Sequence, residues 1–213
     1  MHTLKTVTKN EMVAPGVHLI SFKPAAAFNA GQMVAVGITR SGPKRLYSIA
    51  SGETDQEMSI LFDIKPDGAL TPSLALVQAG DSIVCSPPHG SFLATTEPAW
   101  LIATGTGIAP FRSMLRSGQT ANKKIIHGGR FLYSFYFQDE IKKSGTNYVR
   151  CCTQQAAKGV FHGRLTNYLR ETELPVSGCR YYLCGSAEMV VDTRDLLISR
   201  GIAFDNILSE IYF

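Results

Sequence analysis

The sequence has little that points to metal, disulfide or membrane chemistry. Its five cysteines include no CxxC pair, and an odd count without such spacing fits neither a disulfide framework nor a zinc site. The ligand spacing of an iron-sulfur cluster is also missing, so any redox chemistry requires another cofactor. No apolar run approaches the roughly 20 residues of a membrane-spanning helix.

The N-terminal stretch and the net charge of the chain also limit the classes of protein that fit the sequence. The N-terminal stretch MHTLKTVTKNEMV lacks the apolar core and small-residue cleavage site of a secretory signal, so we expect a cytoplasmic protein. The formal net charge is +4, and the lysines and arginines are scattered. Such a surface can attract an acidic protein or a phosphate-bearing ligand, but it lacks the basic stripe with interleaved aromatics that nucleic-acid binding requires.

A length of 213 residues favours two domains, and the pattern changes near residues 95–98. Residues 1–96 contain short Val-, Ile- and Phe-rich segments between Gly and Pro turns, which is typical of a small antiparallel barrel or sandwich. Of the two, we expect an antiparallel β-barrel of Greek-key type. Residues 97–213 alternate apolar strands with helical segments, which predicts an α/β domain with a parallel sheet. Strands are expected at 16–22, 32–38, 45–50, 58–64, 81–86, 99–105, 123–130, 148–154 and 179–186, and helices at 108–118, 131–145 and 187–201.

One short helix is expected within the first domain, in the segment TPSLALVQAG. Thr71 can cap this helix, Pro72 can occupy its first position and Gly80 can end it. The rest of the first domain is predicted to be all-β.

The heptapeptide RLYSIAS combines a strand pattern with a site pattern. Because side chains alternate along a strand, Arg45 and Tyr47 are expected on one face and Ser48 on the other. By itself the segment also fits an edge strand with an exposed arginine and a half-buried tyrosine.

The segment LIATGTGIAPFRSML reads as a strand, a glycine turn and a helix. Gly105 and Gly107 permit close backbone approach, and Pro110 suits the first turn of a helix whose free amides attract an anion. Dinucleotide binding uses such a turn, although the full GxGxxG fingerprint is absent and an isolated GxG is often only a tight connection. Two more strand ends carry glycine-flanked groups, Arg130 in HGGR and Cys184 in CGS, which alone also fit a solvated arginine and an inert buried thiol.

The order of the motifs RLYS, GALT, TGTGIAPF, HGGR, CGS and SEIYF resembles the ferredoxin-NADP reductase family over nearly the whole chain. The resemblance is closest to the compact bacterial branch and lacks the iron-sulfur module that is fused in some oxygenase reductases. It implies an FAD-binding domain at 1–96, an NADP(H)-binding domain at 97–213, and a monomer whose partner is a ferredoxin or flavodoxin.

For FAD, the resemblance implies that Arg45 pairs with the pyrophosphate, Tyr47 lies against the isoalloxazine ring and Ser48 reaches flavin N5. One of the two C-terminal aromatics is expected to stack on adenine, with Phe213 preferred and Tyr212 beside it. The full set implied for FAD is Arg45, Leu46, Tyr47, Ser48, Leu61, Phe62, Asp63, Gly68, Leu70, Thr71, Thr106, Tyr212 and Phe213.

The catalytic set that the resemblance implies is Ser48, Cys184 and Glu210, in which Glu210 orders the site near the other two and relays a proton. Without the resemblance, Glu210 reads as a solvated carboxylate at a frayed terminus. The set implied for the nicotinamide nucleotide is Thr104, Gly105, Gly107, Pro110, Arg130, Gln154, Arg164, Cys184 and Gly185.

One position departs from the family pattern. Arg130 and Arg164 match two arginines that hold the ribose phosphate of NADPH, but a third family arginine corresponds to Gln154 in this chain. Glutamine cannot neutralise a phosphate, so NADPH is expected with NADH as the alternative.

The implied activity is hydride transfer from NADPH to flavin N5, followed by release of single electrons to the carrier protein. Three alternatives stay open from the sequence: a reductase of free flavin, the reductase component of an oxygenase, and a regulatory subunit that binds flavin and nucleotide without catalysis.

Overall fold

The computed structural model describes residues 2–24 and 26–212, which form two compact units. The first unit runs up to Ala94 and also contains Ala109–Ser117. The second consists of Thr95–Ile108 and of the chain from Gly118 onward. The helix that follows the glycine turn therefore groups with the first unit rather than with the strand that precedes the turn.

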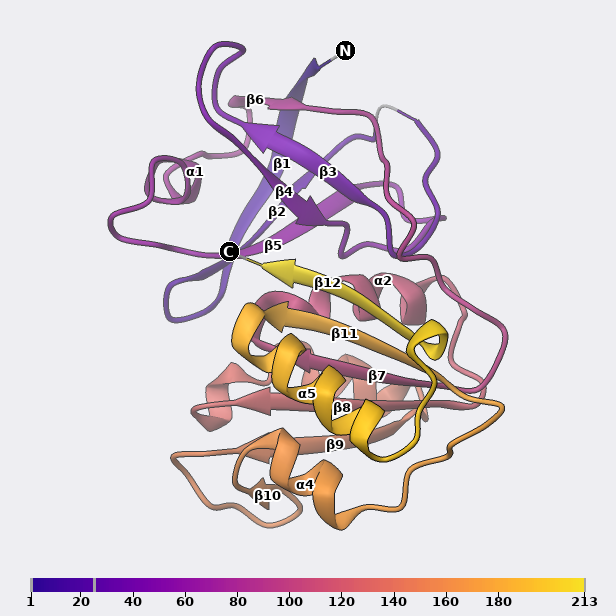
Figure 1. Ribbon diagram of the computed structural model, residues 1–213. Helices are drawn as coiled ribbons and strands as arrows, with labels where there is room; N and C mark the ends of the chain where they lie inside the picture. Colours follow the sequence, from indigo (N-terminus) through magenta and orange to yellow (C-terminus); the bar gives the residue numbers. More distant parts are fainter. Residues whose placement is uncertain (1, 25, 213) are drawn as a thin grey trace. The chain divides into compact units, whose positions relative to one another are not determined.

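The first unit is a six-stranded antiparallel sheet in the order β4-β3-β6-β1-β2-β5 (Figure 1). An antiparallel bridge between Ile49 and Ile60 links the chain after β4 to β5, so the two edges of the sheet meet. The predicted antiparallel barrel is confirmed. Its strands are β1 (Thr3–Ala14), β2 (Val17–Phe22), β3 (Met33–Gly37), β4 (Lys44–Ser48), β5 (Met58–Asp63) and β6 (Ser82–Cys85).

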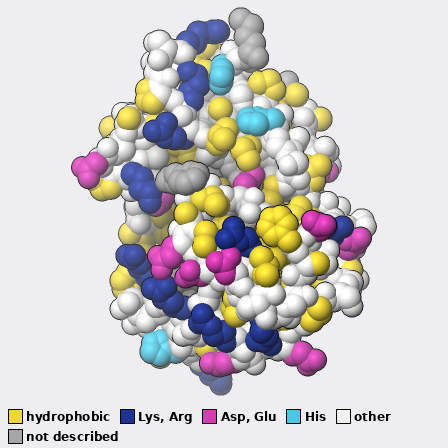
Figure 2. Space-filling view, viewed as in Figure 1, with side chains coloured by type: hydrophobic (Ala, Val, Ile, Leu, Met, Phe, Trp, Pro, Cys, Tyr) yellow, Lys and Arg dark blue, Asp and Glu magenta, His cyan; other side chains and the backbone are white. Residues whose placement is uncertain are grey.

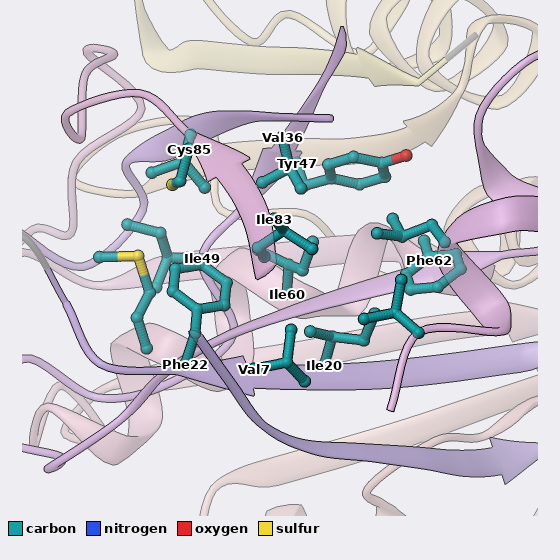
Figure 3. Packing of buried hydrophobic residues seen from close by; sticks show 14 of the residues in the cluster. Val7, Ile20, Phe22, Val36, Tyr47, Ile49, Ile60, Phe62, Ile83 and Cys85 are labelled. Carbon is teal, nitrogen blue, oxygen red and sulfur yellow. The ribbon is translucent and has the colours of Figure 1, made fainter. Parts of the chain in front are cut away.

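The core of the first unit is built from alternate side chains of these strands (Figure 3). Ile20, Val34 and Ile83 are fully buried, as the period-two pattern of half-buried strands predicts. Strand β1 is absent from the strands expected above, because most of its side chains are polar and only Val7 and Ala14 are buried along its length.

Helix α1 (Thr71–Ala75) is shorter than predicted, and its cap differs. Thr71 is the first helical residue rather than the cap, and its Oγ1 accepts a hydrogen bond from the Lys65 amide at 2.8 Å. Gly80 does not end the helix. It lies in the following turn with φ +98°, where its amide donates to the Val7 carbonyl at 2.9 Å.

The second unit is a six-stranded parallel sheet in the order β10-β9-β8-β7-β11-β12, with α4 and α5 on one face (Figure 1). The central strands are buried almost throughout, as expected for a sheet in an α/β unit. The strands are β7 (Ala99–Thr104), β8 (Lys123–Gly129), β9 (Asn147–Cys152), β10 (Phe161–His162), β11 (Arg180–Ser186) and β12 (Ile207–Tyr212). The helices in this part of the chain are η1 (Gly105–Ile108), η2 (Leu132–Ser134), α3 (Gln138–Lys143), α4 (Leu165–Glu171), α5 (Ala187–Ser199) and η3 (Phe204–Asn206), and α2 (Ala109–Arg116) belongs to the first unit.

The single helix expected at 131–145 is wrong. The structure has the short η2 and then α3, because Phe137 between them adopts a left-handed conformation with φ +59° that no α-helix accommodates. The structure also adds β10, α4 and β12, which were not predicted. Among the described residues, no helix is long and apolar enough to cross a membrane.

Candidate functional site

The first group of predicted site residues lies on β4. Tyr47 and Ser48 are buried, whereas Arg45 and Leu46 are exposed. Tyr47 meets Phe62 of β5 edge-on, with ring centroids 6.0 Å apart. This ring contact and the Ile49–Ile60 bridge bring together the two segments that the sequence analysis assigned to the flavin.

Tyr47 is the most informative residue of this group. Burial raises the pKa of Tyr47 to about 12, so the phenol stays protonated. Figure 3 shows its hydroxyl oxygen directed away from the aliphatic side chains of the core. Among the described residues no atom hydrogen-bonds this buried hydroxyl. A buried hydroxyl without a partner costs free energy, so it is suited to a ligand that supplies one.

Strand β5 and the loop that follows it contain the other residues assigned to FAD in this unit. Leu61 and Phe62 are 2% exposed, and Asp63 Oδ2 forms an ion pair with Lys65 Nζ at 2.6 Å. The Gly68 amide donates to the Lys65 carbonyl at 2.9 Å, and Leu70 is packed in the core. The loop 63–71 is thus held by its own backbone.

The second group lies at the carboxyl ends of the parallel strands in the second unit. Thr104 ends β7, and Gly105 begins the turn η1 with φ +54°, a conformation that favours glycine. Thr106 lies within this turn, and Pro110 falls in the first turn of α2 as predicted.

Glycines let the strand ends approach one another closely. A Cβ on Gly107 would lie 2.1 Å from the Cys184 carbonyl oxygen, and one on Gly185 would lie 2.3 Å from Thr104 Oγ1. A Cβ on Gly128 would lie 2.7 Å from a Leu165 methyl carbon. Gly107 is required by its packing against the backbone of β11, and the three glycines together form a cradle at the ends of β7, β8 and β11.

Cys184 and Glu210 face each other across two paired strands, because β11 and β12 run parallel with these residues in register. Burial and the Glu210 carboxylate raise the pKa of Cys184 well above its ordinary value, although a hydrogen bond with Tyr212 lowers it. Cys184 is therefore a neutral thiol, which can line a binding site with an uncharged surface but is a poor nucleophile. Strand pairing also places Glu210 and Tyr212 in the sheet, whereas Phe213 lies outside the described residues.

The residues assigned to the ribose phosphate follow the next three strands. The backbone N–H of Gln154 donates to the Arg130 carbonyl at 2.9 Å, which brings the chain after β8 beside the chain after β9. Arg164 comes two residues after β10 and forms an exposed ion pair with Glu188 at 2.8 Å. Sequence reasoning did not find Glu188, because the pairing depends on the packing of α4 beside α5.

Sequence reasoning also passed over His127, although it lies in the quoted motif HGGR. His127 is fully buried in β8, and its Nδ1 lies 3.1 Å from the Tyr148 hydroxyl. A histidine within the apolar run KKIIHGG was the available signal.

These observations fit the two cofactors that the sequence suggests. The buried Tyr47 hydroxyl without a described partner, beside the exposed Arg45, suits an aromatic ring system that carries phosphate. Thr104 Oγ1 is likewise buried and has no hydrogen-bond partner among residues 2–24 and 26–212, and it lies in a glycine-lined cradle at the carboxyl ends of parallel strands. That edge of such a sheet is where nucleotides bind.

Comparisons with known proteins agree with this assignment. Residues 101–195 match the family model described as the oxidoreductase NAD-binding domain. The chain is 29% identical to ferredoxin-NADP reductase of Pseudomonas aeruginosa, with 90% of this chain and 88% of that protein covered. It is 30% identical to ferredoxin-NADP reductase A of Sorangium cellulosum, with 86% and 77% covered.

A solved ferredoxin NADP+ reductase from Neisseria gonorrhoeae, with bound FAD and NADP, has the same fold. Its TM-score is 0.90 at 24% identity, and the match covers 100% of this chain and 99% of that one. The relative from Sorangium cellulosum shows that this chain, with its glycine cradle and its β4 residues, belongs to the ferredoxin-NADP reductase family.

Proposed function

We propose that the protein is an FAD-dependent oxidoreductase that transfers electrons between NADP(H) and a one-electron carrier protein, a ferredoxin or a flavodoxin. The observation that carries the proposal is the cradle at the carboxyl ends of β7, β8 and β11, where three glycines leave no room for a side chain. Family membership supplies the reaction class.

FAD, when bound, supplies the exchange between a two-electron hydride donor and one-electron acceptors. The first unit would hold it through the Arg45 guanidinium, which matches phosphate oxygens, and the Tyr47 ring. Ser48, which is 2% exposed at the end of β4, offers a hydroxyl in a nearly water-free position. Leu61, Phe62 and the backbone of the loop 63–71 complete this side.

The second unit would hold the nucleotide. The amides of the turn η1 would receive the phosphates, because the free amides of a helical turn attract anions. The neutral Cys184 thiol would form an uncharged wall, which suits a nicotinamide ring better than a thiolate would. Glu210 is fixed opposite Cys184 by strand pairing and would hold or move a proton there.

NADPH is the preferred donor in the proposal, and two features limit that preference. Gln154 replaces a cation, and Arg164 is shared with the Glu188 carboxylate. A carboxylate beside a phosphate-binding arginine competes for it and repels the phosphate. The expected preference for NADPH over NADH is therefore modest.

The partner is expected to be acidic, and the protein a cytoplasmic monomer. The net charge of +4 supports attraction of an acidic carrier. Figure 2 shows a group of Asp and Glu side chains on the face that carries α5, with a row of Lys and Arg side chains below it. Size-exclusion chromatography of the protein alone tests whether it is a monomer, and chromatography with an acidic carrier protein tests whether the two bind.

The deciding experiment compares electron acceptors with both nucleotides. Purified protein is assayed for bound flavin, for reduction of ferricyanide, and for reduction of ferredoxins and flavodoxins with NADPH and NADH in parallel. The proposal expects a yellow protein, ferricyanide reduction and carrier reduction, with the higher kcat/KM for NADPH.

Each rival predicts a different result. A colourless protein that is active only with added flavin would identify a free-flavin reductase. A protein that binds flavin and nucleotide but does not reduce ferricyanide would identify a regulatory subunit. Activity with an oxygenase but with no ferredoxin or flavodoxin would identify an oxygenase reductase component.

A further inference from the structure

Two polar side chains, Asn10 of β1 and His18 of β2, lie on the core-facing side of the first sheet and have no part in the function proposed above. Strand pairing puts Asn10 opposite Ile20 and His18 opposite Phe62, and Ile20 and Phe62 are both buried in the core. Polar groups on such a face need hydrogen-bond partners, because burying them without partners costs free energy. The contacts of these two side chains therefore indicate what they contribute.

Asn10 holds the carboxyl end of helix α1. Its Nδ2 donates to the Ala75 carbonyl at 3.1 Å and to the Val77 carbonyl at 2.6 Å. The last carbonyls of a helix have no partner within the helix, and a helix of only five residues is not stable by itself. The Asn10 amide, which is distant in the sequence, supplies these partners and joins α1 to β1.

His18 is joined to the same amide through its oxygen. The Nδ1 atom of His18 lies 2.9 Å from Asn10 Oδ1. Because both hydrogens of Asn10 Nδ2 go to carbonyls, Oδ1 is the accepting end of this amide, and His18 Nδ1 must carry the proton. A charged imidazole also has a proton on Nδ1, so the hydrogen bond keeps this direction in both charge states of the ring.

The imidazole of His18 also contacts Phe62. The two rings are stacked, with centroids 5.7 Å apart and planes 22° from parallel. Phe62 comes directly before Asp63, where the loop 63–71 begins, and α1 starts at Thr71, where this loop ends. The Asn10–His18 pair therefore connects the residue before the loop to the helix after it.

Apolar packing also holds α1 against the barrel, because Leu74 is fully buried in the core. Apolar contacts have no preferred direction, whereas hydrogen bonds weaken steeply when they are misaligned. The two hydrogen bonds from Asn10 therefore fix how α1 is turned and how far it lies from β1. Through Thr71, whose Oγ1 accepts from the Lys65 amide at 2.8 Å, the position of α1 is passed on to the loop.

We propose that Asn10 and His18 are positioning residues that set the separation between Phe62 and α1, and so hold the loop 63–71 in the shape that receives a phosphate group of FAD. Backbone N–H groups of a loop form concave sites for anions, and hydrogen bonds to phosphate are short and directional. A loop whose far end moves therefore loses much of such a contact. This inference rests on the proposed FAD binding and names residues outside the loop on which that binding depends.

The test separates the phosphate from the flavin ring by the choice of ligand. The full-length protein, freed of flavin, is titrated with riboflavin, which has no phosphate, with FMN, which has the flavin-side phosphate, and with FAD. Flavin fluorescence measures each Kd. The variants are Asn10→Leu, which has a similar shape but neither donor nor acceptor, and His18→Ala, which remains available if Asn10→Leu does not fold.

The expected result is a loss confined to the flavins that carry phosphate. Asn10→Leu and His18→Ala should each raise the Kd for FMN and for FAD about tenfold and leave the Kd for riboflavin within about twofold. The double variant should bind FMN no more weakly than the weaker single variant, because residues that act through one set of contacts are not additive. His18→Asn, which keeps a donor near the Nδ1 position but lacks the ring, should fall between His18→Ala and the original protein.

The matched control is Ser86→Ala. Ser86 Oγ also joins two backbone segments of the first unit, since it accepts from the Ala35 amide and donates to the Pro87 carbonyl, both at 2.8 Å. The control should lower the thermal midpoint without changing the ratio of the Kd for riboflavin to that for FMN.

Three results would overturn the inference: variants that bind FMN like the original protein, a loss of riboflavin binding equal to the loss of FMN binding, or losses that add in the double variant. An original protein that binds FMN no better than riboflavin would overturn it as well. Absence of any flavin binding by the original protein would instead overturn the proposed function.

Discussion

Arg116 of α2 forms two hydrogen bonds with the Asp55 carboxylate: its Nε lies 2.6 Å from Oδ2, and its Nη2 lies 3.0 Å from Oδ1. Two further hydrogen bonds tie the same helix to the chain after β4, from Ser113 Oγ to the Ser51 carbonyl at 2.6 Å and from Arg112 to the Ala50 carbonyl at 3.1 Å. These contacts explain why α2 groups with the first unit.

The Arg116–Asp55 pair should make stability pH-dependent in acid. The pKa of Asp55 is lowered in the folded protein: burial opposes this, but Arg116 and the Gly52 amide outweigh it. A lowered carboxyl pKa gives stability that is present above the unfolded value of about 3.9 and is lost as pH falls through the folded value. Asp55→Asn should cost about 1 kcal/mol at pH 7, near the upper end for a partly exposed pair, and less as the pH falls below about 4.

Urea unfolding at pH 7 and at pH 3 measures this. Glu11→Gln, which removes the more exposed ion pair with Lys9 in the same unit, is the control and should change little at either pH. An equal loss for Asp55→Asn at both pH values would show that the pair does not stabilise the fold through its charge.

Tyr47→Phe should act in opposite directions with and without FAD. The buried hydroxyl has no hydrogen-bond partner in the described part of the chain, so its removal from the flavin-free protein should be neutral or slightly stabilising. If FAD supplies the partner, the variant should bind FAD about fivefold more weakly, the equivalent of about 1 kcal/mol. Thermal midpoints of both forms and a flavin fluorescence titration measure the two effects, and unchanged FAD affinity would contradict the role.

Ser48→Ala should slow hydride transfer more than it weakens nucleotide binding. A hydroxyl that aligns the reacting groups acts on kcat, so we expect a fall of about tenfold or more with KM within about threefold. Stopped-flow reduction of the flavin by NADPH measures the step directly. Ser21→Ala, a buried serine on β2, is the matched control, and turnover of Ser48→Ala equal to that of the control would remove Ser48 from the site.

Gly107→Ala should damage nucleotide binding far more than a glycine change elsewhere. Its Cβ would lie 2.1 Å from the Cys184 carbonyl oxygen and 2.8 Å from the Gly185 nitrogen, so the turn must move off β11. Gly178→Ala is the control, because Gly178 has a positive φ of +66° but nothing within 4 Å of the added carbon. The control should lose about 1 kcal/mol of stability from backbone strain and keep its NADP+ affinity.

Calorimetry with NADP+ and a measurement of FAD content separate the outcomes. We expect Gly107→Ala to retain FAD and to lose at least about tenfold in NADP+ affinity. Retention of full NADP+ affinity would mean that the turn can be displaced without cost, which the close packing does not allow.

Gln154→Arg should sharpen the choice of nucleotide. It puts a cation on the segment after β9, whose backbone lies beside that of Arg130, and a charge-assisted hydrogen bond to a ribose phosphate is worth about 1.5 to 3 kcal/mol. The ratio of kcat/KM for NADPH to that for NADH should therefore rise about tenfold or more. Glu188→Gln should raise the ratio several-fold by releasing Arg164, whereas Glu171→Gln, at the opposite end of α4, should not change it.

Much of the first unit could be predicted because its strands alternate apolar and polar residues between turns. Strand β1 could not, since its only fully buried positions are Val7 and Ala14 and its polar sequence resembles a loop. Helix α1 was predicted in place but not in length, because Thr71 hydrogen-bonds the Lys65 backbone instead of capping.

In the candidate site, the glycine turn and the β4 motif could be predicted from the sequence, because the residues that form each of them are neighbours in the chain. The ion pair of Arg164 with Glu188 and the environment of His127 were not, since each depends on segments far apart in the sequence. The mismatch between the change of pattern near residue 96 and the two compact units has the same origin, because contacts of Arg112, Ser113 and Arg116 decide where α2 belongs.

That placement of α2 bears on how such a protein can be cut and recombined. A fragment that starts at residue 95 contains β7, the turn η1 and helix α2. It lacks the residues of the first unit against which α2 packs. A chimera between two reductases that exchanges the chain at residue 95 would pair Arg116 of one parent with position 55 of the other. A chimera that exchanges the nucleotide-binding half should therefore take residues 50–55 from the same parent as that half. Chimeras that mix the two parents at these positions should have a less stable first unit.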